Sequence, residues 1–294
     1  MRGTPIYDIR TLSDLRDDEI LISRFAPYLA HHKILSAAHR HSFYHLVLFT
    51  EGAGSHSIDF EKFCLKPYQI YFMVPGQVHS WNFDGFTDGY IINFSGSFFQ
   101  TFLLNPSYHD SFSFFGDDMR TAVIDLPEQL HQKIVDLFEA IINEAERKEA
   151  AATDMIKVLM LQLFITVDRV TRKSADKGPA SYNQTLLRNF QKLTGEHYAR
   201  IKLPKDYANL LYITPNHLNA ICKDLLGRSA GEVIRDRMML EAKRLLTNPK
   251  LNINAIASML NFSDNSYFTK FFKKSEGKTP EEFRKEIIDY HRHE

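Results

Sequence analysis

Apolar residues follow two different periods along the chain. Between residues 37 and 99, short runs rich in β-branched and aromatic side chains are separated by glycine or proline, and such runs predict β-strands. From residue 129 onward, apolar residues recur at three- and four-residue spacing, which predicts amphipathic helices. The chain is therefore expected to be α+β and multidomain, with strands first and helices afterwards.

The strand pattern is clearest in four runs, which are residues 43–50, 55–60, 69–74 and 90–94. Short strands at this spacing are typical of a sandwich or small barrel. Two helices are expected directly after the barrel, over residues 129–148 and 153–170. Each has an apolar stripe that must be buried either against its own barrel or against a partner chain.

A polar segment at residues 171–184 contains Gly178-Pro179 and has no apolar period. It is predicted to be a linker. The linker separates an N-terminal domain at residues 1–170 from a C-terminal domain at residues 185–294. The C-terminal domain is expected to be all-helical, and its first helix is expected to end at Gly195.

Residues 251–284 predict two short helices joined by a tight turn and followed by a third helix. The first helix is expected to break at Asn261, and Ser263 is the expected N-cap of the second. Gly277 ends the second helix, because glycine adopts the left-handed conformation without strain. The outer face of that helix carries amides, hydroxyls and lysines, which is the pattern of a helix-turn-helix.

The same pattern occurs earlier, at residues 203–234. Ala208 matches Ala257 at an offset of 49, and after the turn Gly227 matches Gly277 at an offset of 50. A helix predicted over residues 231–247 separates the copies and is about 25 Å long at 1.5 Å per residue. Such a helix is able to hold two recognition helices about one turn of DNA apart, roughly 34 Å, on one side of a duplex.

The formal charge is zero over the whole chain but is unevenly distributed. Residues 181–294 contain 19 Lys and Arg against 13 Asp and Glu, whereas residues 1–180 contain 17 against 23. This asymmetry fits one nucleic-acid-binding domain beside one that does not bind nucleic acid. Cys64 and Cys222 form neither a disulfide framework nor a zinc spacing, and no apolar run reaches 18 residues. We therefore expect a cytoplasmic location and no membrane partner.

Residues 183–290 resemble the DNA-binding domain of the arabinose-operon regulator (AraC/XylS) family. Three segments carry the resemblance, and they read RDRMMLEAKRLL (235–246), INAIASMLNFSDNSYFTKFFKK (253–274) and GKTPEEFR (277–284). One departure is Asn261, where the family usually has glycine; asparagine also tolerates the left-handed conformation, so the turn is expected to survive.

The resemblance implies, position by position, which side chains face DNA. Asparagine pairs with adenine, and lysine pairs with guanine or neutralises phosphate. The implied contacts of the first recognition helix are Asn216, His217, Asn219, Ala220 and Lys223. Those of the second are Asn265, Ser266, Thr269, Lys270, Lys273 and Lys274.

The strings HRHSFYHLVLFTEGAGSHSIDF and IYFMVPGQVHSW resemble the cupin-like ligand-binding domain that often precedes this DNA-binding domain. By the period-two rule, His39, His41 and His45 are expected on one face of one strand, and His79 follows the Pro75-Gly76 turn. Cupin enzymes use a similar HxH pair with a glutamate, but this chain has His45 near the place of that glutamate. The side chains expected to contact an effector are His39, His41, Tyr44, His45, His79 and Trp81.

Three interpretations of the histidines stay open from sequence: contacts to an organic effector, ligands of a transition metal, and plain structural side chains. Trp81 and Tyr44 favour no single effector class, although sugars stack on such rings. We assign no catalytic residue, bound metal or cofactor.

The expected function is a ligand-responsive, sequence-specific transcriptional regulator of the activator type. The implied partners are double-stranded promoter DNA, a small-molecule effector such as a sugar, RNA polymerase and a second copy of the chain in a homodimer. Two alternatives remain: a metal-dependent cupin enzyme fused to a DNA-binding domain, and an effector-independent regulator whose barrel serves only for dimerisation.

Overall fold

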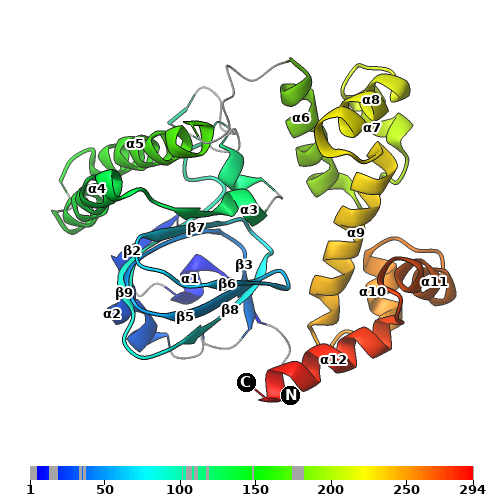
Figure 1. The fold of residues 1–294 in the computed structure, drawn as a ribbon, viewed down its shortest axis with the longest axis horizontal. Coiled ribbons are helices and arrows are strands. Elements are labelled where there is room, and N and C mark those ends of the chain that lie inside the picture. The colour runs from blue at the N-terminus through cyan, green and yellow to red at the C-terminus, as the bar shows by residue number, and fades with distance from the viewer. Residues whose placement is uncertain are drawn as a thin grey trace. The chain divides into compact units, whose positions relative to one another are not determined.

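The computed structural model describes residues 5–12, 19–32, 35, 38–100, 102–103, 108, 112–116, 119–147, 149–173 and 182–293. Two compact units divide at the boundary between residues 178 and 179. The first is rich in strands and the second is helical, so the predicted α+β architecture is confirmed (Figure 1). Most of the predicted linker, residues 174–181, lies outside the described residues.

The N-terminal unit consists mainly of short strands. In chain order its elements are β1 (Ile6–Tyr7), α1 (Ile9–Leu12), β2 (Ile20–Arg24), α2 (Phe25–His31), β3 (His39–His41), β4 (Tyr44–Glu51), β5 (Gly54–Ile58), β6 (Glu61–Cys64), β7 (Gln69–Met73), β8 (Val78–Phe83), β9 (Asp88–Phe94), η3 (Ser113–Phe115), α3 (Met119–Ala122), β10 (Val123–Asp125), α4 (Glu128–Arg147) and α5 (Ala152–Lys173).

These strands form two five-stranded sheets, in the orders β1-β3-β8-β5-β6 and β10-β7-β4-β9-β2. Every pair within the sheets is antiparallel except β1 with β3. The four predicted strand runs correspond to β4, β5, β7 and β9. Strand β8 was not predicted from the sequence, because His79, Ser80 and Asn82 interrupt its apolar pattern.

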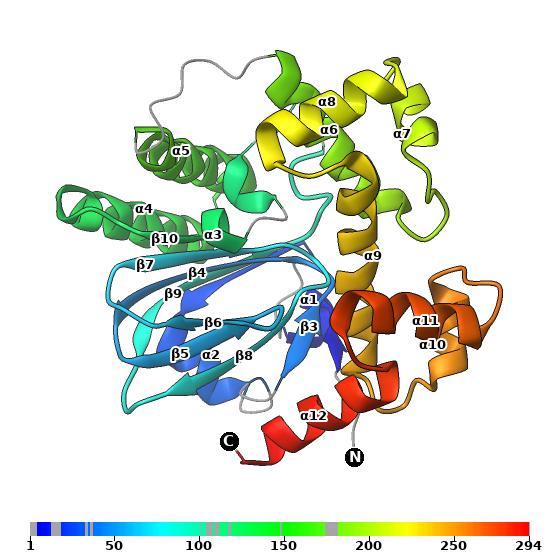
Figure 2. The same ribbon diagram turned by 45° about the vertical axis from the view of Figure 1, so that its right-hand side comes forward.

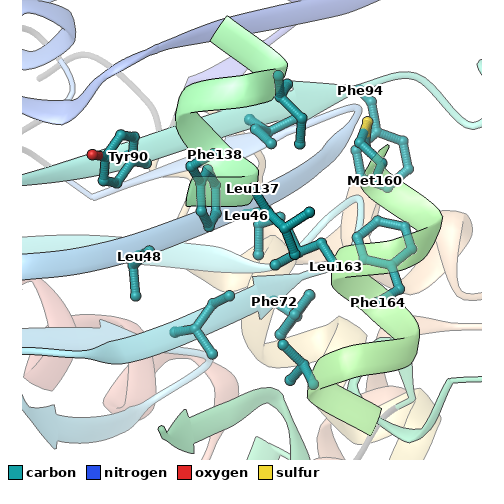
Figure 3. Close-up of a cluster of buried hydrophobic side chains, with 14 of the residues drawn as sticks. Leu46, Leu48, Phe72, Tyr90, Phe94, Leu137, Phe138, Met160, Leu163 and Phe164 are labelled. Carbon is teal, nitrogen blue, oxygen red and sulfur yellow. The ribbon is translucent and has the colours of Figure 1, made fainter. Parts of the chain in front are cut away.

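The sheet that contains β7, β4 and β9 is buried on both faces. Along β4, Val47 and Phe49 point to the barrel interior, while Leu46 and Leu48 belong to the core beneath α4 and α5. A strand covered on both sides needs apolar residues at successive positions, which explains the unbroken run LVLF. Figure 3 shows Leu46 and the neighbouring side chains of this outer core against the two helices.

Helices α4 and α5 bury their predicted apolar stripes against this sheet. Phe138 of α4 stacks on Tyr90, with ring centroids 5.1 Å apart, and Phe164 of α5 packs among Phe72, Phe94 and other aromatic rings. Figures 1 and 2 show both helices lying over β7, β4 and β9. The apolar stripes were expected to be buried either on the chain's own sheets or on a partner chain, and the structure shows burial on the chain's own sheets.

The C-terminal unit is entirely helical in its described residues. Its elements are α6 (Tyr182–His197), α7 (Pro204–Leu210), α8 (Pro215–Leu226), α9 (Ala230–Leu246), α10 (Ile253–Met259), α11 (Asn265–Glu276) and α12 (Pro280–His293). The prediction that Gly195 ends the first helix is wrong, because α6 continues to His197. A glycine costs a helix only about 1 kcal/mol relative to alanine, and the buried Phe190 and Thr194 hold this part of α6 in place.

Helix α9 takes part in two separate cores. Its Ile234 packs with α6, α7 and α8, while Met238 and Leu245 pack with α10, α11 and Phe283 of α12. Figures 1 and 2 show α6–α8 at one end of α9 and α10–α12 at the other. Within the described part of the chain, no helix combines the length and the apolar character required to cross a bilayer.

Candidate nucleic-acid interface and buried histidine cluster

The first helix-turn-helix is formed by α7 and α8. The Thr214 hydroxyl caps α8 by accepting a hydrogen bond from the His217 backbone N–H at 3.2 Å, and Pro215 occupies the first helical position. Gly227 ends α8 with φ of +69°, and its N–H donates to the Lys223 carbonyl at 3.0 Å. These local signals explain why the chain turns at both ends of α8.

The second helix-turn-helix is formed by α10 and α11. Asn261 adopts φ of +54°, as expected for the turn, and Gly277 adopts +75° at the end of α11. The expectation that Ser263 caps α11 is wrong. The cap is Asp264, whose carboxylate accepts from the Tyr267 N–H at 2.7 Å, because α11 begins one residue later than predicted.

Most of the residues predicted to contact DNA lie on exposed faces of α8 and α11. Asn265, Thr269 and Asn219 are half-buried. The exposed members are Asn216, His217, Ala220, Lys223, Ser266, Lys270, Lys273 and Lys274. The structure therefore brings each predicted set together on one helix, while contact with DNA stays a prediction.

Asn219 has a structural role at the start of α9, which was not predicted from the sequence. Its side-chain oxygen accepts a hydrogen bond from the Ala230 backbone N–H, the first of α9, at 3.0 Å. The equivalent of Ala230 in the second unit is Pro280, which has no N–H to satisfy. Thr269, the equivalent of Asn219, instead donates to the Asn265 side chain at 3.3 Å. Because its side-chain oxygen is already in use, Asn219 is less available than Asn216 for a bidentate hydrogen-bonded contact with adenine.

Tyr267 is a surface residue of α11 that the predicted contacts omitted. Its side chain is 57% exposed. The repeat offset of 50 places it at the position of His217, which was included, so the sequence contained the signal.

The N-terminal unit contains a cluster of five histidines between the two sheets. All five side chains are at most 2% exposed; they are His39 and His41 of β3, His45 of β4, His56 of β5 and His79 of β8. The prediction of one strand for His39, His41 and His45 is wrong, because the chain bends at Ser42-Phe43 and enters the other sheet. They still converge, because the two sheets face each other.

The ring nitrogens of the cluster lie close together. The Nε2 atoms of His41 and His79 are 2.8 Å apart, and those of His39 and His41 are 3.1 Å apart. The Nε2 of His56 lies 3.0 Å from the Nδ1 of His79. His56 was not predicted, since no spacing relates it to the other four.

Of the two aromatic residues predicted to contact the effector, only one lies beside the histidine cluster. Trp81 packs against the cluster, with its ring centroid 4.9 Å from that of His79. Tyr44 lies on the opposite side of β4, stacked on Phe94 at 4.9 Å, in the core beneath α4 and α5. The structure does not bring Tyr44 to the histidines, because adjacent residues of a strand point to opposite faces.

Burial keeps four rings of the cluster uncharged. Desolvation, reinforced by the neighbouring histidines, lowers the pKa of His41, His56 and His79 well below the usual value. Burial also lowers the pKa of His45 to about 3, although its hydrogen bond to Asn93 opposes the shift. These four rings are therefore neutral at pH 7, and each has one nitrogen lone pair.

These features define a class of protein, in which a double-sheet unit is followed by two helix-turn-helix units. Residues 25–164 match the family model of the AraC-like ligand binding domain, and residues 207–286 match that of a helix-turn-helix domain. The chain belongs to the AraC family, with an AraC-like ligand-binding domain followed by a helix-turn-helix domain.

Curated relatives extend the likeness over both units. The arabinose operon regulatory protein of Salmonella typhimurium is 22% identical over 250 residues, which cover 82% of this chain and 83% of that protein. The Msm operon regulatory protein of Streptococcus mutans is 33% identical over 107 residues, or 36% of this chain and 38% of the relative. PqrA of Proteus vulgaris, a probable transcription factor, is 43% identical over 68 residues, 23% of this chain and 56% of the relative. The chain thus spans less than two thirds of the latter two relatives.

Proposed function

We propose that this chain is a transcriptional activator that binds a specific promoter sequence as a homodimer and responds to a small ligand. The observation that carries the proposal is the repeated helix-turn-helix, with each copy built on its own core and both attached to α9. A single such unit is also found in helical domains of other functions, whereas two copies on one connecting helix suit two successive major grooves.

The length of α9 supports binding to one side of a duplex. Its 17 residues span about 25 Å, which allows the two recognition helices to lie about one DNA turn apart. The second helix is the more cationic: α11 carries Lys270, Lys273 and Lys274, whereas Lys223 of α8 is followed by the acidic Asp224. We expect α11 to contribute more of the phosphate attraction and both helices to read bases.

Control by a ligand would act through the N-terminal unit. His39, His41, His45, His79 and Trp81 face one another there, and we propose that the effector acts at this cluster. A ligand changes a regulator only when it binds one arrangement of the chain more tightly than another. Among organic effectors, sugars suit the Trp81 ring.

The proposed dimer contact lies on the outer face of α5. Since its inner stripe is buried on the barrel, only the outward side chains are available to a partner. Met155 and Val158 are 49% and 47% exposed there, and Leu161 and Ile165 are half-buried. Two copies of this face would bury apolar surface symmetrically.

The remaining partners follow from the proposed activity. An activator bound at a promoter acts on RNA polymerase, and promoter DNA places the chain in the cytoplasm. The relatives named above are regulatory proteins, which supports a regulator without enzymatic activity.

Selection from random duplex DNA with the full chain, followed by sequencing at two salt concentrations, tests the proposal. We expect a motif with two contact blocks about 10 base pairs apart, and weaker binding at the higher salt. Salt-sensitive binding without any recovered motif, with and without added metal ions or sugars, would contradict sequence-specific recognition.

A further inference from the structure

The histidine cluster contains more imidazoles in closer contact than packing alone requires. Its five rings come from four strands of both sheets, and all are buried. One ring nitrogen from each of His39, His41 and His79 lies within 4.8 Å of the others, and this group contains imidazoles only. Such a set of nitrogen ligands suits zinc, copper, nickel or iron, whereas magnesium and calcium require oxygen.

The nitrogen spacing is close to that of a bound metal. Two nitrogens on a tetrahedral zinc, each at about 2.0–2.1 Å from it, are about 3.3 Å apart. The observed Nε2 separations are 2.8 Å for His41 with His79 and 3.1 Å for His39 with His41. Ring movements of a few tenths of an ångström would therefore admit an ion, without rearrangement of the strands.

Neighbouring groups leave suitable lone pairs on two of the rings. Asn93 presents its side-chain oxygen to His45 Nδ1 at 2.7 Å, so this nitrogen carries the proton and Nε2 keeps the lone pair. His45 Nε2 is buried and has no hydrogen-bond partner among the described residues. Likewise, a proton on His79 Nδ1 can be donated to His56 Nε2, which leaves His79 Nε2 as a ligand.

Without an ion, His41 and His56 have too few complementary partners. The Nε2 of His41 faces two other Nε2 atoms, but a neutral ring nitrogen either donates or accepts. Within the described part of the chain, the Nδ1 atoms of His41 and His56 also lack hydrogen-bond partners. Buried polar atoms without partners are rare in folded proteins and indicate a group that remains to be added.

We propose that the N-terminal unit binds a divalent transition metal ion through His39, His41 and His79. His45 stacks on His41 and is available as a further imidazole beside this site, while His56 orients His79 and Asn93 orients His45. The inference rests on the proposed function only in that this unit takes up a ligand, and it gives that ligand a chemical class. The three ligands come from β3 and β8, so the ion would hold these two strands of one sheet together, and contact with His45 of β4 would also join the second sheet.

The test uses the full chain without a histidine tag, stripped with a chelator and dialysed. The protein is titrated with Zn²⁺ and with Co²⁺, and with Mg²⁺ as the control ion. Calorimetry measures the binding, and elemental analysis measures the bound metal per chain. We expect about one equivalent of Zn²⁺ or Co²⁺ per chain, and visible absorption from nitrogen-bound Co²⁺. We also expect a Tm increase on the order of 5 °C at a free Zn²⁺ concentration about 100 times Kd.

Three variants locate the site. His41→Gln and His79→Gln are expected to lose at least tenfold in affinity, whereas His31→Gln, at an exposed position in the same unit, is expected to bind normally. If the cluster variants do not fold, the wild-type Co²⁺ spectrum and stoichiometry decide. Absence of stoichiometric binding, or binding that His79→Gln leaves unchanged, would overturn the metal site.

DNA binding is measured on the same samples with and without Zn²⁺. Metal binding without a DNA motif would refute the proposed function and leave the metal site intact. A DNA motif without metal binding would refute the metal site and leave the proposed function intact.

Discussion

At the scale of single residues, the two helix-turn-helix units solve the same problem differently. In the first, the first N–H of α9 needs an acceptor, and Asn219 provides it. In the second, Pro280 removes that need, so Thr269 and Asn265 pair with each other instead. Equivalent positions in a sequence repeat are therefore not equivalent in the chemistry they offer to DNA.

Asn219→Ala is expected to lower the free energy of unfolding by about 1 kcal/mol, because the N–H of Ala230 loses its side-chain acceptor. Urea denaturation of the full chain measures the change. Asn216→Ala, at an exposed position of the same helix, is expected to stay within about 0.5 kcal/mol of the wild type. Equal stability of the two variants would show that the Asn219 bond contributes nothing.

Asn265→Ala and Lys273→Ala are expected to affect DNA binding in different ways. The first should relax preference at one base pair and cost about 1–3 kcal/mol on the preferred site. The second should weaken binding to all sequences alike and reduce the salt slope by about one. Competition binding at several salt concentrations separates the two effects, with Lys250→Ala, outside the recognition helices, as the control. Identical behaviour of the two variants would refute the assignment.

At the scale of elements, Arg24 connects three parts of the N-terminal unit. It is the last residue of β2, directly before α2, and its guanidinium lies 2.7 Å from Asp88 of β9 and 2.9 Å from Glu139 of α4. Asp88 also accepts from the Ala26 N–H in the first turn of α2 at 2.9 Å. Although burial alone would raise the pKa of Asp88, hydrogen bonds from Arg24 and from the backbone N–H groups of Ala26 and Gly89 outweigh it and lower the pKa.

The lowered pKa of Asp88 makes its contribution to stability dependent on pH. A carboxyl whose pKa is lower in the folded chain stabilises the fold above the unfolded value of 3.8, and the stabilisation is lost as the pH falls below it. Asp88→Asn is therefore expected to cost about 1.5–3 kcal/mol at pH 7 and less near pH 3. Urea denaturation at both values checks this, with Asp84→Asn, at an exposed position, as the control. A cost that does not change with pH would contradict the role of the charge.

At the scale of the whole molecule, the inner face of α5 serves the fold of its own unit, whereas the outer face is available for assembly with a second chain. The inner face completes the core of its own unit through Met160, Leu163 and Phe164, and this core requires no partner. The outer face leaves Met155 and Val158 exposed. Assembly is therefore expected to depend on side chains that the fold of the chain itself does not use.

Met155→Glu combined with Val158→Glu is expected to convert the proposed dimer into a 34.1 kDa monomer at micromolar concentration, because like charges would face each other across the symmetric contact. Sedimentation velocity measures the mass, and the Tm is expected to change little. Asn143→Glu, at an exposed position of α4, serves as the control. A wild-type chain that sediments only as a monomer would remove the proposed dimer.

Local chemistry made much of the C-terminal unit predictable. Gly227, Asn261 and Gly277 act through their own backbone preferences, and each is found where the sequence indicated. Ser263 failed as a cap because two adjacent residues, Ser263 and Asp264, are both able to cap, and the choice depends on where packing of Phe268 and Phe272 starts the helix.

The sequence by itself determined the order of the domains, the repeat and the family, because these depend on period, spacing and local backbone chemistry. Only the tertiary structure decided what the histidines do together. A two-residue bend after His41 sends β4 into the second sheet, and because the two sheets face each other, His45 still meets His39, His41, His56 and His79. The facing of two sheets is a property of non-local strand pairing, which no period along the chain encodes.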